Sequence, residues 1–331
     1  MSCFASALRT TALATLLAVV AIWQTPSHAQ SPDRIYRLGH LASTSSSAQG
    51  TRSEMLPALA RLGFSEGRNL VLDARFGAAD ELPGLMRELL ATKPDAIITV
   101  GPNALRAAAE ATSLVPIISF GPDPVELGLA RSRARPGRNV TGVMILGGEL
   151  DPKRLDLLHE AVPKARSVAV LFSAEYPLIT LEGKRAGMRA AAASLGIALL
   201  DFTVATPDDH AAAFAAMRAA GVQALVIGGS PQLDRDTKLL AVHALEAQLP
   251  TACEWARSTQ VGCLLGYSPS TAALRQRMAD QVARILRGAA PGEQPIEGPS
   301  VFDFAINLKI AKALGITIPQ SLLARADEVI E

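Results

Sequence analysis

Aromatic residues and net charge are both scarce in this sequence of 331 residues. Phe, Trp and Tyr make up 4% of it, and 32 basic against 31 acidic residues leave a formal net charge of +1. A broad basic face for nucleic acid is therefore not implied, and we expect no nucleic-acid partner. With 49% hydrophobic and 19% charged residues, the sequence is also too apolar for a disordered chain.

Short motifs that hold phosphates, dinucleotides or metals are missing as well. Neither the G-x-x-x-x-G-K-[ST] loop nor the G-x-G-x-x-G fingerprint occurs, and the five His residues have no metal-ligand spacing. The closest approach to the hydrolase motif G-x-S-x-G is Gly228-Gly229-Ser230-Pro231-Gln232, which lacks the final Gly. We expect no metal, cofactor or catalytic residue and no enzyme activity; an exported α/β hydrolase is the weaker alternative.

Residues 1–29 have the three parts of a secretory signal peptide. Arg9 is the only charged side chain before Asp33, an apolar run follows at residues 12–23, and the segment ends in Ser27-His28-Ala29. As a helix this run is about 18 Å long, which is short for a bilayer core of about 30 Å. We expect cleavage after Ala29, a periplasmic location and no membrane embedding. An uncleaved anchor is the alternative.

Cysteine is limited to Cys3, Cys253 and Cys263, and only the last two remain after cleavage. They flank a stretch whose pattern indicates a strand end, a short helix and another strand. Export places them where disulfides persist. A disulfide between them and a pair of buried free thiols are both consistent with the sequence.

Beyond the signal peptide, short apolar strands alternate with helices. The expected strands lie at residues 35–41, 70–76, 96–100, 115–120, 167–172, 198–204, 224–227, 249–253 and 262–267, with a late strand within 297–307. Helices are expected between them, among others at residues 81–91, 103–112, 152–162, 181–195, 207–220, 233–248 and 271–287. Repeated βαβ units build parallel sheets covered by helices on both faces.

Two such series predict an α/β protein with two lobes, each a doubly wound parallel sheet, joined by hinge crossovers around a ligand cleft. We expect the N-terminal lobe at residues 30–142, completed by about 268–300, and the C-terminal lobe at residues 143–267, completed by about 301–331. In sheets of this kind ligands bind outside the carboxyl ends of the strands. Two lobes that face each other therefore share one cleft.

Several sequence blocks resemble a known family over nearly the whole mature chain. They are LGFSEGRNL at 62–70, LVPII at 114–118, GPDPVELGL at 121–129, RPGRNVTG at 135–142 and INLKIAKALGITIPQSLLARADE at 306–328. Together they resemble the ABC-transporter substrate-binding proteins of the tryptophan/phenylalanine-binding (TrpX-like) type. Family members often carry Gly-Gly where this chain has Gly137-Arg138.

The resemblance implies a type I periplasmic-binding fold, in which two lobes joined by three crossovers close on a small molecule. It implies an amino acid or a related compound as the ligand, and no cofactor. The partners implied are a membrane permease and, through the permease, its ATPase. The protein itself is expected to be a monomer.

Candidate binding residues of the N-terminal lobe follow the ends of its expected strands. They are Ser43, Thr44, Ser45, Gly101, Asn103, Gly121 and Asp123. The hydroxyls suit a ligand carboxylate or a helix cap, the glycines suit close backbone approach or a strand end, and Asp123 suits a ligand amine or a cap. Among the histidines, only His40 is expected near the cleft.

Candidates in the C-terminal lobe also follow strand ends. They are Glu175, Tyr176, Ser230, Glu254, Trp255 and Tyr267. In a chain so poor in aromatic residues, three rings at equivalent places favour a ligand surface, although packing in the lobe core is an alternative. The two Glu residues are candidate partners for a cationic group.

Two functions remain open beside the hydrolase. One is the solute-binding component of an ABC importer, which delivers its ligand to the permease. The other is a ligand sensor for a membrane receptor, which uses the same fold.

Overall fold

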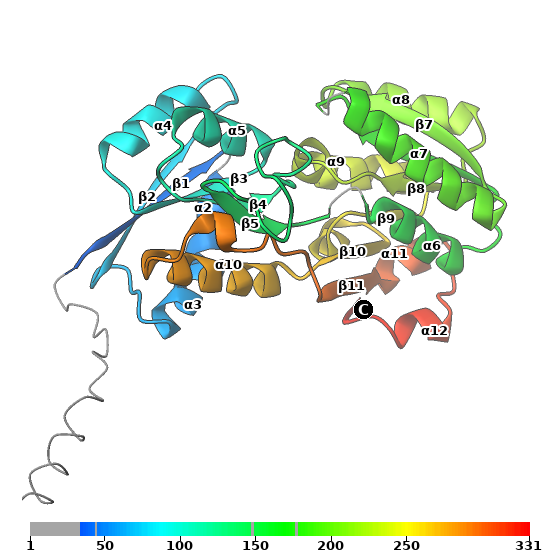
Figure 1. Ribbon diagram of the computed structural model, residues 1–331. Coiled ribbons are helices and arrows are strands. Elements are labelled where there is room, and N and C mark those ends of the chain that lie inside the picture. The colour runs from blue at the N-terminus through cyan, green and yellow to red at the C-terminus, as the bar shows by residue number, and fades with distance from the viewer. Residues whose placement is uncertain (1–33, 44, 147–148, 176–177) are drawn as a thin grey trace, which may run out of the picture.

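The computed structural model describes residues 34–331 except residue 44, residues 147–148 and residues 176–177. The predicted signal peptide therefore lies outside the described residues. Two α/β lobes lie side by side, each with its own sheet (Figure 1). No helix in the described part of the chain combines the length and the apolar character needed to cross a membrane.

The first sheet has five parallel strands in the order β2-β1-β3-β4-β5. They are β1 (Tyr36–Ala42), β2 (Leu70–Phe76), β3 (Ala96–Val100), β4 (Ile117–Gly121) and β5 (Val140–Met144). The central strand β3, AIITV, is an apolar run between neighbours on both sides, as expected for a parallel strand buried on both faces. Residues 138–143 were not expected to form a strand, yet β5 is the edge strand of this sheet.

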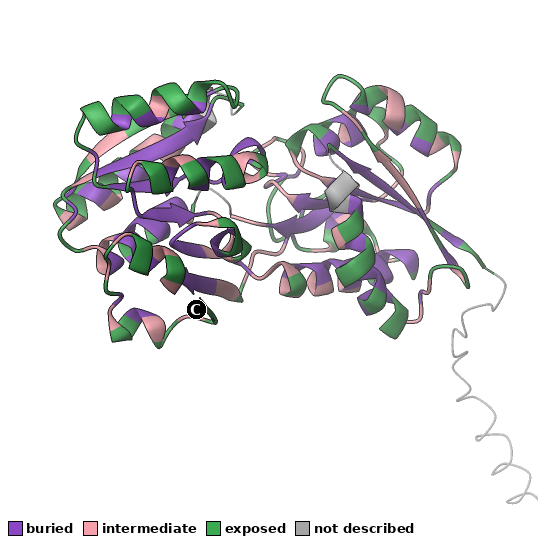
Figure 2. Ribbon diagram, turned by 180° about the vertical axis from the view of Figure 1, so that it is seen from behind, coloured by how far each residue is buried: buried purple, intermediate pink, exposed green. Residues whose placement is uncertain are grey.

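Helices cover both faces of the first sheet. They are α2 (Ser45–Gly50), the π-helical turn η2 (Thr51–Met55), α3 (Leu56–Arg61), α4 (Leu82–Ala91), α5 (Pro102–Ala111) and, from far along the chain, α10 (Thr271–Leu286). Because side chains alternate along a strand, Leu38 packs with α3 and α10, whereas Leu41 packs with α4 and α5. The buried strands between half-exposed helices are visible in Figure 2.

The second sheet has seven strands in the order β12-β11-β10-β9-β8-β6-β7. They are β6 (Ser167–Ser173), β7 (Ala198–Val204), β8 (Ala224–Ile227), β9 (Thr251–Cys253), β10 (Leu265–Pro269), β11 (Phe302–Asn307) and β12 (Glu328–Ile330). All neighbours are parallel except β10 and β11, which are antiparallel. The prediction of two α/β lobes with doubly wound, largely parallel sheets is confirmed.

Helices of the second lobe again form two layers. They are α6 (Asp151–Ala161), α7 (Leu178–Leu195), α8 (Asp209–Ala219), α9 (Pro231–Glu246), the 3-10 turn η3 (Ala256–Val261), α11 (Leu308–Ala313) and α12 (Gln320–Leu323). One core cluster joins α6, α7, α11 and α12 to the sheet, and a second joins α8 and α9 to its opposite face. Each lobe thus has its own hydrophobic core.

The chain crosses between the sheets after β5, after β10 and before β11. The crossing segments are bound to one another. The Met144 N–H donates to the Glu297 carbonyl at 2.8 Å, and the Ser270 N–H donates to the Val301 carbonyl at 2.9 Å. The short turn η4 (Pro291–Glu293) precedes the last crossing. The lobe limits at residues 142 and 267 stay predictions; β5 and β10 end at Met144 and Pro269.

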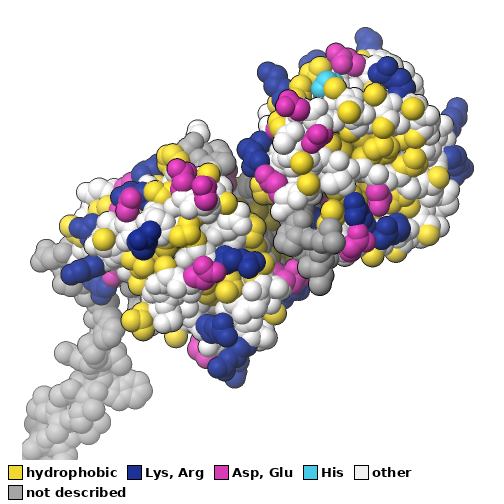
Figure 3. Space-filling model, turned by 90° about the horizontal axis from the view of Figure 1, so that it is seen from above, with side chains coloured by type: hydrophobic (Ala, Val, Ile, Leu, Met, Phe, Trp, Pro, Cys, Tyr) yellow, Lys and Arg dark blue, Asp and Glu magenta, His cyan; other side chains and the backbone are white. Residues whose placement is uncertain are grey.

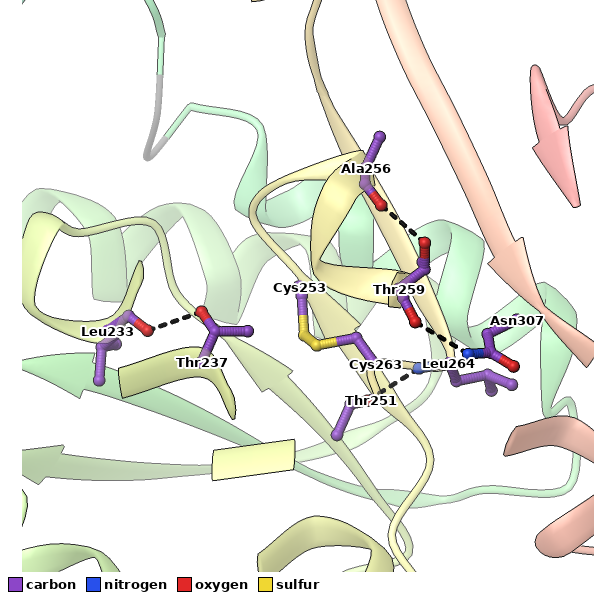
Figure 4. Close-up of a disulfide and its surroundings, with 9 residues drawn as sticks. All are labelled: Leu233, Thr237, Thr251, Cys253, Ala256, Thr259, Cys263, Leu264 and Asn307. Carbon is purple, nitrogen blue, oxygen red and sulfur yellow. Dashed lines mark hydrogen bonds between the residues drawn. A yellow bond between two sulfur atoms is a disulfide. The ribbon is translucent and has the colours of Figure 1, made fainter. Parts of the chain in front are cut away.

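Cys253 and Cys263 form a disulfide, so the pairing that the sequence left open is present (Figure 4). Their Cα atoms are 6.3 Å apart, and both side chains are buried in the core under α9. The loop that the bond closes contains η3 and the two residues before it, Glu254 and Trp255. It is also held by the Thr251 hydroxyl, which accepts from the Leu264 N–H at 3.1 Å.

Removal of the disulfide should destabilise the protein without changing its fold. We expect the Cys253→Ser/Cys263→Ser variant to lose about 2–3 kcal/mol of unfolding free energy, because the unfolded chain regains the freedom of the closed loop. Urea unfolding of both proteins measures this difference. In wild type, thiol labelling under denaturing, non-reducing conditions should modify neither residue; labelling of both would contradict the pairing.

Candidate functional site

Two groups of strand ends face the space between the lobes. In the first sheet β1, β3 and β4 are neighbours, and in the second β9, β8 and β6 are neighbours, so the loops that follow each group lie together. Seen from above, the surface is hollowed between the lobes (Figure 3). The carboxyl ends of parallel strands are where open α/β sheets bind ligands. This edge is therefore the candidate site.

In the first lobe the structure brings the loops after β3 and β4 into contact. Gly101 and Gly121 both have positive φ values, 88° and 115°, which favour glycine. The Gly101 N–H donates to the Phe120 carbonyl at 3.1 Å. Gly101 precedes the first residue of α5, and Asn103 is exposed in the first turn of that helix. Both are placed to meet a ligand, and their binding role stays a prediction.

The loop after β1 is only partly described. Ser43 is exposed directly after the strand, and Ser45 is the first residue of α2. Thr44 lies outside the described residues. Ser43 and Ser45 thus follow the end of β1, as expected.

Asp123 holds its own loop together. One carboxylate oxygen accepts from the Val125 N–H at 2.8 Å, and the other accepts from Arg133 Nε at 2.7 Å. The side chain is nearly buried. Asp123 does not cap a helix, because residues 124–128 form a turn; contact with a ligand amine stays a prediction.

In the second lobe, buried polar side chains join the ends of β6 and β8. Ser230 is the N-cap of α9, where its Oγ accepts from the Leu233 N–H at 3.0 Å. Gln232, in the first turn, is 3% exposed, and its Oε1 accepts from Ser173 Oγ at 2.5 Å. Gln232 was not among the predicted site residues, although it belongs to the Gly-Gly-Ser-Pro-Gln segment examined for a hydrolase.

Glu175 lies outside this buried group. Its exposed carboxylate accepts from the Arg235 guanidinium at 2.9 Å. Tyr176 lies outside the described residues. A ligand contact by either residue stays a prediction.

Trp255 lies two residues after β9, at the place that the sequence predicted. Its backbone passes so close to Gly266 that position 266 has no space for a side chain. Arg257 covers the indole ring at 4.5 Å from the ring centre and donates to both oxygens of Asp234 in α9 at 2.8 Å. The indole is thereby fixed beside the first turns of α9.

The carboxyl group of Glu254 ionises near neutral pH. Desolvation at the end of β9 raises the pKa of its carboxyl to about 7, although the positive charge of Arg154 opposes the shift. At neutral pH this group is therefore partly protonated. A cationic group brought into the cleft would restore its charge.

A buried ion pair behind these loops was missed from the sequence. Asp151 and Arg154 in α6 are 2.5 Å apart, and both side chains are completely buried. Asp151 accepts from the Gly229 N–H at 3.1 Å, after β8. Arg154 donates to the Glu254 carbonyl at 3.1 Å, after β9, and to the Tyr267 carbonyl at 2.9 Å, in β10. Only burial distinguishes this pair from surface charges, and burial depends on tertiary structure.

Tyr267 is not where the sequence placed it. Strand β10 continues to Pro269, so Tyr267 lies within the strand and not past its end. Its ring stacks on Phe302 of β11, with centres 5.5 Å apart. With Lys153 and Leu157 of α6 it lines a surface groove of about 290 Å³. The surroundings of Tyr267 therefore agree with the packing role that the sequence analysis gave as the alternative.

His40 lies inside β1 and is completely buried. Desolvation, together with the positive charge of Arg275, lowers the pKa of its imidazole to about 4. It is therefore neutral at pH 7. In the described part of the chain, no group of His, Cys, Asp and Glu side chains is arranged to hold a metal ion.

Loss of Arg154 should destabilise the second lobe strongly. We expect Arg154→Met to lower the unfolding free energy by about 3–5 kcal/mol, because it leaves the buried Asp151 carboxylate with only the more distant Lys184, whose Nζ is 3.9 Å away, as a cationic partner. Adding Asp151→Leu should recover part of the loss. Chemical denaturation of the single and double variants measures both effects.

A matched control is Arg325→Met, which breaks the exposed pair with Glu160 and should cost less than about 1 kcal/mol. Equal losses in the buried and exposed variants, or strictly additive losses in the double variant, would contradict the assignment.

Comparison with known proteins identifies the family. The sequence model of the ABC transporter substrate-binding proteins matches residues 44–330, so the chain belongs to this family. Its members bind small molecules, and the resemblance noted in the sequence is confirmed.

Individual relatives agree with this assignment. A tyrosine-binding protein of Clostridioides difficile is 31% identical over 122 residues, which cover 36% of this chain and 34% of that protein. A conserved domain protein from Vibrio cholerae has a TM-score of 0.80 at 24% identity, covering 89% of this chain and 100% of the other. A domain from Streptococcus pneumonia in complex with L-Trp has a TM-score of 0.76 at 22% identity, covering 88% and 100%. These structures show that the fold is shared.

Proposed function

We propose that this protein is the exported solute-binding component of an ABC importer and that it binds an amino acid between its lobes. Family membership over residues 44–330 is the observation that carries the proposal. The arrangement of polar groups at the strand ends supports it. Delivery to a membrane permease, cleavage after Ala29 and a periplasmic location belong to the same proposal.

Two comparisons favour an aromatic amino acid as the ligand. One relative, aligned over 34% of its length, is named a tyrosine-binding protein, and one structural neighbour contains bound L-Trp. The cleft supports a zwitterionic ligand on physical grounds. Gly101 and Gly121 leave backbone accessible in the first lobe, and Glu254 offers an acid for the ammonium group. Turnover of the ligand is not part of the proposal.

Trp255 provides the direct test. It is the only Trp among the described residues, so its fluorescence should report ligand entry with little background. We expect L-tyrosine or L-phenylalanine to change this fluorescence saturably. Trp255→Ala should weaken binding measured by calorimetry by more than about 1 kcal/mol.

Trp255→Phe keeps an aromatic ring at this position. Comparing it with Trp255→Ala therefore separates the effect of lost packing from the effect of losing the indole. Unchanged affinity of Trp255→Ala for a ligand that wild type binds would leave Trp255 as a packing residue. Absence of binding for a full set of amino acids would contradict the proposed ligand class. Capture of a permease by the loaded protein would favour the importer over a sensor.

Binding should also depend on pH through Glu254. An ammonium group favours the ionised acid, so affinity should rise as pH increases through the pKa of about 7. Between pH 6 and 8 we expect a gain of about tenfold, since the ionised fraction grows by that factor. Titration calorimetry at several pH values measures it.

Glu254→Gln should bind more weakly at pH 8 and lose this pH dependence. Glu246→Gln, an exposed change at the far end of α9, should keep both. An unaltered pH profile in Glu254→Gln would rule out Glu254 as the ammonium partner.

A further inference from the structure

Two N–H donors beside the first turns of α9 have no acceptor. Gln232 Nε2 and Trp255 Nε1 are both buried, and neither has a hydrogen-bond partner among the described residues. A buried donor without a partner has lost its hydrogen bonds to water and gained none in exchange. Such groups at a strand-end cleft indicate a polar group that arrives from outside the chain.

The orientation of the Gln232 amide follows from its neighbour. Ser173 Oγ accepts from the Glu175 N–H at 3.1 Å and donates its own hydrogen to Gln232 Oε1 at 2.5 Å. The amide oxygen is therefore the partner of Ser173, and the NH₂ group is the end left free. The side chain as a whole is 3% exposed, and water does not reach its NH₂ group.

The position of Trp255 follows from Arg257. The guanidinium lies over the indole ring and binds Asp234, which is in the first turn of α9. The two free donors thus flank the same helix end. Ser173, Gln232 and Trp255 come from the ends of β6, β8 and β9, which are neighbours in the sheet.

The electrostatic setting favours an anionic acceptor. Helix α9 has 16 residues, and its N-terminal end, after Ser230, carries the positive end of the helix dipole. Asp234 is compensated by Arg257, and Glu175 is compensated by Arg235.

We propose that Gln232 and Trp255 bind the carboxylate of the ligand at the N-terminus of α9. This inference rests on the proposed function and assigns the carboxylate of the amino acid to the second lobe, whereas the sequence left open a carboxylate contact or a helix cap for the hydroxyls of Ser43, Thr44 and Ser45. Neither donor nitrogen is reached by solvent in the structure, so contact requires a side-chain rotation at the cleft wall. Each donor then exchanges an unmet hydrogen bond for a charge-assisted one.

Gln232→Glu tests the proposal with little change of shape. It keeps an acceptor for Ser173 and replaces the NH₂ group by an oxygen that repels a carboxylate. We expect calorimetry with L-tyrosine to show at least about tenfold weaker binding. With L-tyrosinamide, which lacks the carboxylate, the same substitution should have a much smaller effect. Gln248→Glu, an exposed change after α9, is the matched control and should bind as wild type does.

Trp255→Phe is the second variant, and it removes the N–H while keeping a ring. It should lower affinity for L-tyrosine more than for L-tyrosinamide. If Gln232→Glu fails to fold, this comparison tests the proposed carboxylate contact by itself. Wild-type affinity for L-tyrosine in folded Gln232→Glu, or equal losses for acid and amide, would overturn the inference alone. If wild type binds none of L-tyrosine, L-tryptophan and L-phenylalanine, the proposed function fails and the inference falls with it.

Discussion

The buried pair of Asp151 and Arg154 is the interaction on which the second lobe's binding edge depends. Three backbone groups converge on it, from Gly229 after β8, Glu254 after β9 and Tyr267 in β10, and neither charged side chain is exposed to water. Burying two ions is costly, and their attraction offsets the cost only when every remaining donor and acceptor is satisfied. Here the satisfied groups are backbone atoms of the strand-end loops. The pair therefore fixes those loops relative to α6, and through them Glu254 and Trp255.

The two walls of the cleft differ in kind. The first lobe presents glycines and a helix end, which offer backbone groups and little bulk. The second lobe presents side chains instead. The disulfide holds their loop, Arg257 lies over the indole ring of Trp255, and the buried amide of Gln232 binds Ser173. A wall of fixed side chains selects a ligand by its chemistry, whereas a wall of accessible backbone suits many ligands. Selectivity should therefore reside mainly in the second lobe.

The sequence was sufficient for the architecture because its signals are local. Apolar runs ended by Gly or Pro, as in β3, located most strands, and their alternation with helices indicated parallel sheets. It failed at β5, whose residues pair as a strand only because β4 lies beside them. Glu254 and Trp255 were predicted as site residues because they lie within two residues of the end of a strand. Gln232 and Arg154 were missed because their importance comes from burial, which no short pattern of residues records.

The order of the strands has a consequence for when the molecule acquires its structure. Helix α10 covers the first sheet, and β11 and β12 complete the second, so both lobes use chain from beyond residue 270. A ribosome that releases residues in order leaves both cores incomplete until residues 271–330 have emerged. Contacts between such distant segments also form slowly. A chain with this layout completes both lobes only with its last segments, the first lobe with α10 and the second with β11 and β12.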